Sequence, residues 1–173
     1  MDPRLSLIYA RRSIRRFDGR PIPRELLDEL LAAAMAAPSA NDTRPWEFVV
    51  ITAASRRAII AQRHPYAHFA AEAGAVIVVF GDRGAPQLEQ TLSAATENLL
   101  LAAAGLGLGA CWCGMNAERQ GPIRDLTGIP GGKWIVSLVC VGFPAETKEP
   151  RTHFDPARVH WERYGGKAPR GSG

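Results

Sequence analysis

A group of guanidinium side chains near the start of the chain is the feature of the sequence best suited to binding an anion. Arg11, Arg12 and Arg15 flank the hydroxyl of Ser13, just after a predicted helix. Guanidinium forks and a hydroxyl donor in that arrangement suit one phosphate group. The tight cluster of residues 11–16 therefore predicts a phosphate site.

Two further segments carry groups that suit a flat heterocycle. Ser39 and Asn41 lie in the polar loop of residues 38–45, where an amide can pair with the mixed donor and acceptor edge of such a ring. Residues 110–115 form an apolar strand that ends at Gly114, where the backbone can approach a ring closely. Together the segments indicate a ligand with a phosphate and a planar ring.

The distribution of charge also favours an anionic ligand. The chain has 173 residues and a formal net charge of +4, and 18 of its 21 Lys and Arg residues are arginine. Residues 1–24 carry seven of these arginines, and the segment from Lys148 onward is basic too. Nucleic acid is a poorer candidate, because no zinc-finger spacing, RNP-like motif or recognition-helix pattern is present. Arginines that only solubilise the surface would explain the composition but not the cluster at residues 11–16.

Other motifs give weaker signals. Cys111 and Cys113 form C-x-C, which fits neither a zinc site nor a redox dithiol, so buried hydrophobic cysteines are expected. His64 and His68 are four residues apart, but no acidic or cysteine partner stands at ligand spacing, so no metal is predicted. The glycines of residues 105–109 follow a helix and do not complete a dinucleotide fingerprint.

Periodicity predicts the elements that would position these groups. Hydrophobic residues make up 46% of the chain and charged residues 22%, as in packed globular domains. Helical and strand patterns alternate along the chain. The predicted helices cover residues 3–12, 25–37, 55–62, 86–106 and 118–126, and the predicted strands cover residues 46–52, 75–80, 109–113 and 135–143. This order predicts an α+β or α/β sheet flanked by helices.

The second half of the helix predicted at residues 86–106 is apolar all round, so we expect it to be buried within the domain or against another subunit. We expect residues 1–164 to form a single domain and residues 165–173 to form a disordered tail. The first residues lack the features of a secretory signal, which favours the cytoplasm. The longest nearly apolar run is shorter than the roughly 20 residues of a membrane span, so no membrane partner is predicted.

Four segments give the chain a specific resemblance that covers nearly its whole length. The chain resembles the nitroreductase family in four segments, which match it in order and approximate spacing. They are RRSIRRF (11–17), APSANDTRPWEFVV (37–50), SAATENLLLAAAGLGLGACWCG (93–114) and VGFPAETKEPR (141–151). Members of this family are flavoproteins that hold FMN at a homodimer interface. The resemblance implies an α+β nitroreductase-like fold with a central mixed β-sheet flanked by helices, in a homodimer with shared active sites.

The resemblance also implies which residues bind the cofactor. Arg11, Arg12 and Ser13 would hold the FMN phosphate, and Arg151 with Lys148 would close on it from the end of the chain. A cation near the pyrimidine side of the ring would stabilise the negative charge of the reduced flavin.

The remaining implied contacts surround the ring. Arg15 would supply the cation near the pyrimidine. Residues Pro38, Ser39 and Ala40 would reach the flavin from the other subunit, and Asn41 belongs to the same loop. The residues Cys113 and Gly114 would place backbone N–H groups near the flavin N5.

The implied activity is that of an FMN-dependent oxidoreductase. It would take hydride from NADPH or NADH and reduce a small electron-poor acceptor, such as a nitroaromatic or a quinone, by a ping-pong mechanism. The flavin N5 would do the chemistry, so no dedicated catalytic residue is expected. Reductive dehalogenation, flavin destruction and a non-catalytic flavin-binding dimer remain alternatives, because a fold does not specify a reaction.

Some positions depart from the family pattern. Asp42 and Arg44 stand where asparagine and glutamine are common, and Thr91 stands where an acidic residue is common. Little chain separates the strands at Val50 and Val76, which leaves little material for a lid. An open substrate pocket is therefore predicted.

Overall fold

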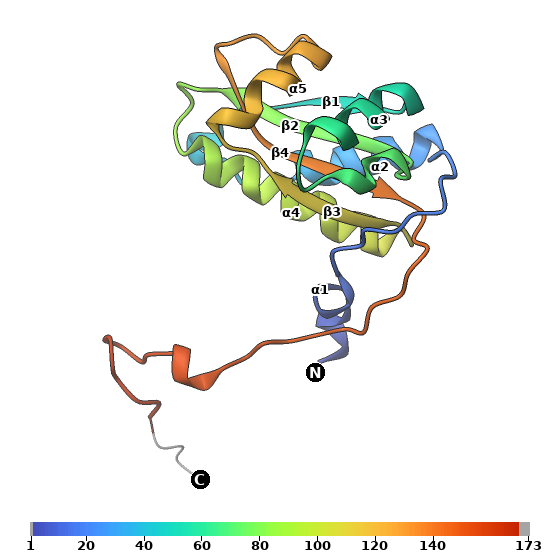
Figure 1. Cartoon of the computed structure of the whole chain (residues 1–173). Helices are drawn as coiled ribbons and strands as arrows, with labels where there is room; N and C mark the ends of the chain where they lie inside the picture. The colour runs from blue at the N-terminus through green and yellow to red at the C-terminus, as the bar shows by residue number, and fades with distance from the viewer. Residues whose placement is uncertain (1, 170–173) are drawn as a thin grey trace.

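Alternating apolar segments build a sheet with helices on both of its faces (Figure 1). The computed structural model describes residues 2–169. The helices are α1 (Ser6–Ala10), α2 (Arg24–Met35), α3 (Ala54–Arg63), α4 (Leu88–Gly105) and α5 (Gln120–Thr127). The strands are β1 (Trp46–Ile51), β2 (Ala75–Asp82), β3 (Gly109–Gly114) and β4 (Lys133–Gly142). The expected sheet flanked by helices is confirmed.

Strand pairing places β3 at one edge of the sheet. The strand order is β1-β2-β4-β3, and each neighbouring pair is antiparallel. The resemblance implies a mixed sheet, whereas the neighbouring strands of this sheet all pair antiparallel. Within residues 2–169, parallel pairing is confined to one isolated bridge between Ser13 and Ala110, so the parallel component lies in a loop that runs beside β3.

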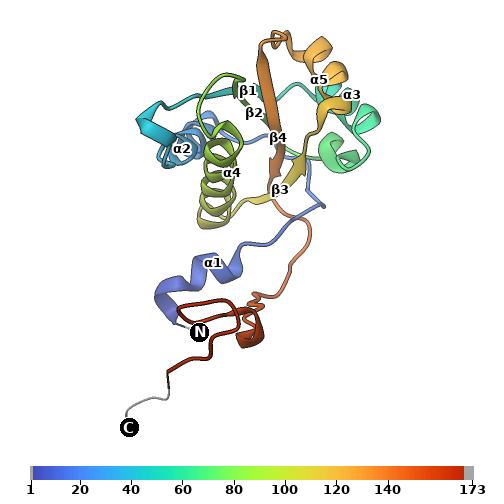
Figure 2. The ribbon, with the colours of Figure 1, turned by 90° about the vertical axis from the view of Figure 1, so that its left-hand side faces the viewer.

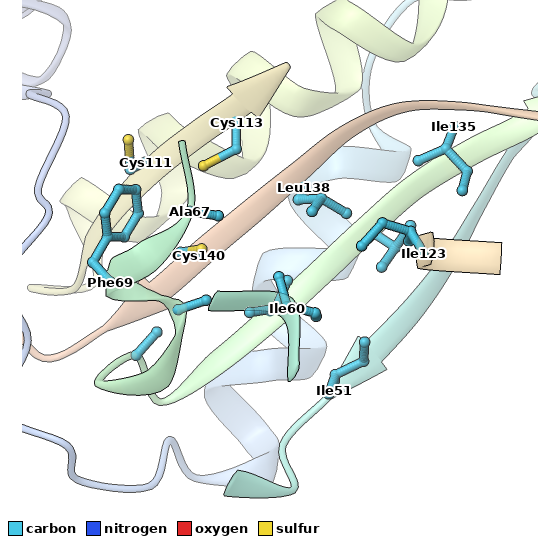
Figure 3. Close-up of a cluster of buried hydrophobic side chains, with 14 of the residues drawn as sticks. Ile51, Ile60, Ala67, Phe69, Cys111, Cys113, Ile123, Ile135, Leu138 and Cys140 are labelled. Carbon is cyan, nitrogen blue, oxygen red and sulfur yellow. The ribbon is translucent and has the colours of Figure 1, made fainter. Parts of the chain in front are cut away.

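The central strand β2 is buried on both faces because each layer of helices covers one set of its side chains. Val76 and Val78 pack in the cluster that includes α3 and α5, which Figure 3 shows. Ile77 and Val79 pack in the cluster that includes α2 and α4. Figure 2 shows the two helix layers on opposite sides of the sheet. Because β2 carries apolar residues in succession, neither face of the sheet is open to solvent.

The first helix is shorter than its sequence pattern predicts. A 3-10 turn at Pro3–Leu5 precedes α1, which ends at Ala10 because Arg11 is extended, with φ −60° and ψ 119°. This change of backbone carries residues 11–16 away from the helix and along the sheet edge. In α4, Leu99 is fully buried, but Leu101 on the outer side is only half-buried.

After β4 the chain leaves the body of the domain. In Figure 1 this segment and α1 stand off from the sheet and its helices. Phe154, Trp161 and Tyr164 expose 76%, 48% and 92% of their surface. Residues 165–169 form no helix or strand, and the last four residues of the predicted tail, 170–173, lie outside the described residues. The disordered tail and the 1–164 domain boundary remain predictions.

No helix within the described part of the chain is both long enough and apolar enough to cross a lipid bilayer.

Candidate functional site

The two basic ends of the described chain meet beside the edge of the sheet. The backbone N–H of Arg151 donates to the carbonyl oxygen of Tyr9 at 3.1 Å. The Arg12 guanidinium donates to the carbonyl oxygen of Glu149. The Lys148 ammonium donates to the carbonyl oxygen of Ser13 at 2.5 Å. These contacts bring the Arg12 and Lys148 side chains and the backbones of Ser13 and Arg151 into a single cluster.

Glu146 fixes the backbone of this cluster. Its Oε1 accepts from the backbone N–H groups of Arg15 at 2.6 Å and Arg16 at 3.2 Å. The same oxygen lies 3.3 Å from the Lys148 ammonium. The Arg15 N–H, followed by Lys148, lowers the pKa of Glu146 below its ordinary range despite some burial. The carboxylate therefore stays ionised and holds residues 15–16 against the C-terminal segment.

The segment 11–16 is also hydrogen-bonded to β3. The backbone N–H of Ile14 donates to the carbonyl oxygen of Ala110 at 3.0 Å. A Cβ added at Gly109 would lie only 2.7 Å from the Ile14 side chain, so a glycine is needed for this close approach. Residues 11–16, which we call the cationic loop, are thereby held against β3 at the edge of the sheet.

A cavity of about 240 Å³ opens beside the cationic loop. We call it the basic cavity. Its lining includes Arg12, Leu100, Ala104, residues 107–110, Glu146 and Lys148. The cations of Arg12 and Lys148 in this lining suit a compact anion.

A second cavity of about 500 Å³ lies along the edge of β3. We call it the edge cavity. Its lining consists of Arg15, residues 65–66, residues 68–69, residues 111–115 and Arg119. Its volume falls within the roughly 300–1,000 Å³ that is usual for pockets binding small molecules and cofactors.

Gly114 keeps one end of the edge cavity open. A Cβ built at this position would meet no heavy atom within 4 Å. The backbone N–H of Met115 donates to Val136 of β4 at 3.2 Å. Because N–H groups alternate in direction along an antiparallel strand, those of Trp112 and Gly114 point away from β4. The edge cavity is thus bordered by backbone donors that a planar ligand can approach.

Cys111 and Cys113 line the edge cavity and also belong to the hydrophobic core. Cys111 and Cys113 each expose 2% of their surface, and Figure 3 shows them beside Phe69 in the core. Contact with the Cys113 thiol and burial raise the pKa of Cys111. The Cys111 contact lowers the pKa of Cys113, but contact with Cys140 and burial together raise it to about 12. Neutral thiols are weak nucleophiles, so thiolate catalysis finds no support here.

The structure does not bring every predicted cofactor residue to these cavities. Arg11 instead forms an ion pair with Glu97 of α4, with Nε and Oε1 3.1 Å apart. Residues 38–41 follow α2 and line neither cavity. Within this loop the Ser39 hydroxyl accepts from the N–H of Arg44 at 3.1 Å. Pro38, Ser39, Ala40 and Asn41 therefore face no part of the basic or edge cavity of their own chain.

The departures from the family pattern lie in and beside the same loop. Asp42 and Arg44 form an exposed ion pair at 2.6 Å. Asn41 and Asp42 both have φ 53°, and Arg44 has φ 47°, a region that few residues other than glycine enter. Buried Thr91 lies under the loop, with its hydroxyl 3.5 Å from the N–H of Ala40. The loop is thus organised by its own polar contacts and by α4.

Sequence reasoning missed four residues that shape the site. Glu146 fixes the cationic loop. Tyr66 and Arg119 line the edge cavity near Gly114, and His64 lies behind this wall, in contact with the Gly114 carbonyl. His64 was noticeable only as half of a weak metal-ligand pair. Among residues 2–169 no group of three or more His, Cys, Asp or Glu side chains is placed to hold a metal ion.

Comparison with known proteins gives consistent matches. The sequence model of the Nitroreductase family matches residues 8–63 and 61–143. A Methanothermobacter thermautotrophicus protein provisionally named NADH dehydrogenase/NAD(P)H nitroreductase is 40% identical over 166 residues, which cover 92% of this chain and 87% of that protein.

Solved structures share the fold. A Bacteroides thetaiotaomicron protein with the same provisional name superimposes with a TM-score of 0.90 at 32% identity, covering 95% of this chain and 99% of that one. A Desulfovibrio desulfuricans nitroreductase, also provisionally named and solved in complex with FMN, has a TM-score of 0.79 at 31% identity, covering 94% and 98%. This chain belongs to the nitroreductase family.

Proposed function

We propose that this protein is an FMN-dependent oxidoreductase that takes electrons from NADPH or NADH and reduces a small electron-poor acceptor such as a nitroaromatic or a quinone. One observation carries the proposal. A cationic cluster contributed by both ends of the chain adjoins a cavity of about 500 Å³ whose border is the backbone edge of β3. FMN joins a phosphate to a planar ring through a ribityl chain, and both cavities adjoin the same loop of residues 11–16.

The chain's own residues fit such a cofactor. Arg12 and Lys148 face the basic cavity and would hold the phosphate. Arg15 lines the edge cavity and would place its charge near the pyrimidine. The open space at Gly114 is a cradle that a Cβ would fill, so a flat ring can approach the backbone N–H there. Ser13 and Arg151 line neither cavity, but backbone contacts tie them to the same cluster, and their side chains would complete the phosphate contacts.

Bound FMN supplies a carrier that accepts two electrons as hydride from a nicotinamide and passes them to an acceptor. The protein has to hold the cofactor, keep Arg15 near it and leave room for a second flat molecule. The two thiols that line the edge cavity are neutral and buried, so no covalent step through the protein is required. A shared binding place for donor and acceptor gives the ping-pong order of the proposal.

Two copies of the chain would form the complete site. The outer side of α4 carries half-buried Ala94, Leu101 and Ala104, which lie at helical spacing on one face. Exposed aromatic side chains of the C-terminal segment add apolar surface that a monomer leaves in water. In this homodimer residues 38–41 would act at the neighbouring copy's cofactor, which accounts for their absence from the cavities of their own chain.

Reductive dehalogenation and flavin destruction use the same cofactor and therefore the same residues. A non-catalytic flavin-binding dimer would also use them. No contact within residues 2–169 favours any of these over electron transfer from a nicotinamide, and provisional names of the relatives that include NAD(P)H support the first reading.

Steady-state kinetics of the FMN-loaded protein test the proposal. Varying NADPH at several fixed concentrations of a nitroaromatic acceptor should give parallel double-reciprocal lines. Intersecting lines would contradict the ping-pong order, and no turnover with nitroaromatics or quinones would favour the flavin-binding dimer. Release of halide from halogenated phenols, or loss of added reduced flavin, would point to the other two reactions.

A further inference from the structure

His64 bridges two walls of the edge cavity. It is the residue after α3, and it exposes only 1% of its surface. Its backbone N–H donates to the carbonyl oxygen of Ile60 at 2.9 Å, and its carbonyl oxygen accepts from Ala67 at 3.0 Å. The backbone of His64 is therefore held by main-chain contacts on both sides.

The two ring nitrogens make different contacts. Nε2 lies 3.3 Å from the carbonyl oxygen of Gly114. Nδ1 accepts from the backbone N–H of Tyr66 at 3.3 Å. A carbonyl can only accept and an N–H can only donate, so both contacts are made only by the neutral ring with its proton on Nε2.

The Gly114 carbonyl oxygen is contacted by two side chains from different segments. Besides His64, it accepts from the guanidinium of Arg119 at 3.4 Å. That guanidinium stacks over the Tyr66 ring, with Cζ 4.9 Å from the ring centre. The Cys113 thiol in turn donates to the carbonyl oxygen of Tyr66 at 3.4 Å. Residues 64–66 are thereby tied to the end of β3.

The direction of the Gly114 backbone gives these contacts a function. In a β-strand the N–H and C=O of one residue point to the same side. The oxygen that His64 holds and the N–H that borders the edge cavity therefore belong to the same outward edge. The Gly114 oxygen belongs to the 114–115 peptide unit, whose N–H donates to Val136, so His64 holds the free end of that unit and restricts how Gly114 and its own N–H can turn.

We infer that His64, as the neutral Nε2–H tautomer, is a positioning residue that aims the Gly114 backbone at the ring bound in the edge cavity and fixes the Tyr66 wall opposite it. This inference rests on the proposed function. His64 does not touch the ring; it acts through the carbonyl of Gly114 and the N–H of Tyr66.

The groups around His64 favour the neutral ring. Burial lowers the pKa of His64 below its ordinary value, the Gly114 carbonyl opposes this, and Arg119 lowers the pKa further. The other groups facing the imidazole are the Tyr66 ring, at 6.3 Å between centres, and the Cys113 thiol that binds the same Tyr66 backbone. No carboxylate in the described part of the chain forms an ion pair with His64, so only the Gly114 carbonyl favours a charge on the ring.

The tautomer is tested on the cofactor-free wild-type protein. Nitrogen-15 NMR of the imidazole at pH 7.5 should show a protonated Nε2 and an unprotonated Nδ1 for His64. The opposite tautomer, or a charged ring, would overturn the inference. This measurement needs no FMN, so it stands even if the protein proves to bind another ligand.

Positioning is tested with paired variants of the FMN-loaded protein. His64→Gln keeps a donor that can reach the Gly114 carbonyl, whereas His64→Leu removes it. We expect His64→Leu to raise the dissociation constant of FMN roughly 2- to 10-fold, the value of one net hydrogen bond, and to shift the visible absorption of bound FMN. His64→Gln should retain most of the wild-type affinity and spectrum.

A control separates positioning from loss of stability. Ile60 is fully buried in the same helix and lines neither cavity, so Ile60→Val should lower Tm without changing the flavin spectrum. The Met115 N–H donates to Val136 and belongs to the same peptide unit as the Gly114 carbonyl. Its amide exchange in the cofactor-free proteins should accelerate in His64→Leu and not in Ile60→Val.

Equal flavin spectra, FMN affinities and Met115 exchange in wild type and His64→Leu would refute the positioning role. If His64→Leu does not fold, the comparison of wild type with His64→Gln decides. A Gln variant that loses the wild-type spectrum while Tm is unchanged would then contradict the donor role. Failure of the wild-type protein to bind FMN would refute the proposed function and leave the tautomer result standing.

Discussion

The ammonium group of Lys148 lies 2.5 Å from the carbonyl oxygen of Ser13, 135 positions earlier in the chain. This contact joins the two basic segments that the sequence shows as separate features. Because Glu146 binds both Lys148 and the Arg15 backbone, the cluster is held before any ligand arrives. A preorganised cluster loses less conformational entropy when an anion binds.

Arg12→Ala should weaken FMN binding. A charge-assisted contact contributes about 1.5–3 kcal/mol, so we expect the dissociation constant to rise about 10- to 100-fold. Fluorescence quenching of FMN on titration with cofactor-free protein measures it. Arg16→Ala is the matched control, because the Arg16 side chain lines neither cavity. An unchanged affinity in Arg12→Ala would refute the phosphate role of this residue.

Gly114→Ala and Gly109→Ala should distinguish a glycine that ligand binding requires from a glycine that folding requires. The Cβ at position 114 would enter open space, whereas at position 109 it would meet Ile14 at 2.7 Å. We expect Gly114→Ala to keep the Tm of the cofactor-free protein and weaken FMN binding. Gly109→Ala should lower Tm outright. Full FMN affinity in Gly114→Ala would mean that no ring approaches this backbone.

Stability should fall in mildly acidic solution because of His64. Burial lowers the pKa of His64 in the folded protein, so the unfolded chain binds its proton first as the pH decreases. The destabilisation by His64 is absent above about pH 6.5, the pKa of an unperturbed histidine. It grows as the pH falls below this value, until the pH reaches the pKa of His64 in the folded protein. Urea unfolding of wild type and His64→Gln between pH 5 and 8 checks this. An equal slope in both proteins would assign the effect to other groups.

Protonation of Glu146 should also lower stability, but at a lower pH than protonation of His64. Its pKa is lowered in the folded protein by the Arg15 N–H and Lys148, so its contribution is complete above the ordinary value near 4.5 and is lost as the pH falls through the folded pKa. Replacement by Gln should flatten the stability profile below that value. If the acid limb of the Glu146→Gln profile matches wild type, the carboxylate does not hold residues 15–16 in solution.

Leu101→Glu should disrupt the proposed homodimer. The side chain is half-buried on the outer side of α4 in one chain, and a charge on an apolar interface is left without its hydration. Sedimentation at micromolar concentration should show a dimer for wild type and monomer for the variant. A wild-type monomer would contradict the shared site, and a dimeric variant would place the interface elsewhere.

The layers of the fold follow from sequence patterns, but their pairing does not. Residues 75–80 are a continuous apolar run, which predicts a strand buried on both faces and is typical of parallel sheets. Here the neighbours of β2 are antiparallel, and the expected parallel pairing is reduced to the Ser13–Ala110 bridge. Strand direction depends on where each connection returns, and a local pattern does not carry that information.

The site was only partly predictable for a similar reason. Arg12 and Arg15 are recognisable by their local cluster. His64 acts on Gly114, 50 positions away, and Glu146 acts on Arg15, 131 positions away, and neither pair has a sequence spacing that marks it. Arg11 belongs to the same cluster as Arg12, yet α4 supplies Glu97 as its partner.

Anaerobic reduction of the bound cofactor tests the central claim most directly. The visible absorption spectrum of the purified protein, reconstituted with FMN, is recorded before and after addition of NADPH, and then of NADH. The proposed function predicts that the oxidised flavin band bleaches with at least one donor and returns when a nitroaromatic or quinone is added. A bound flavin that stays oxidised with both donors would contradict it.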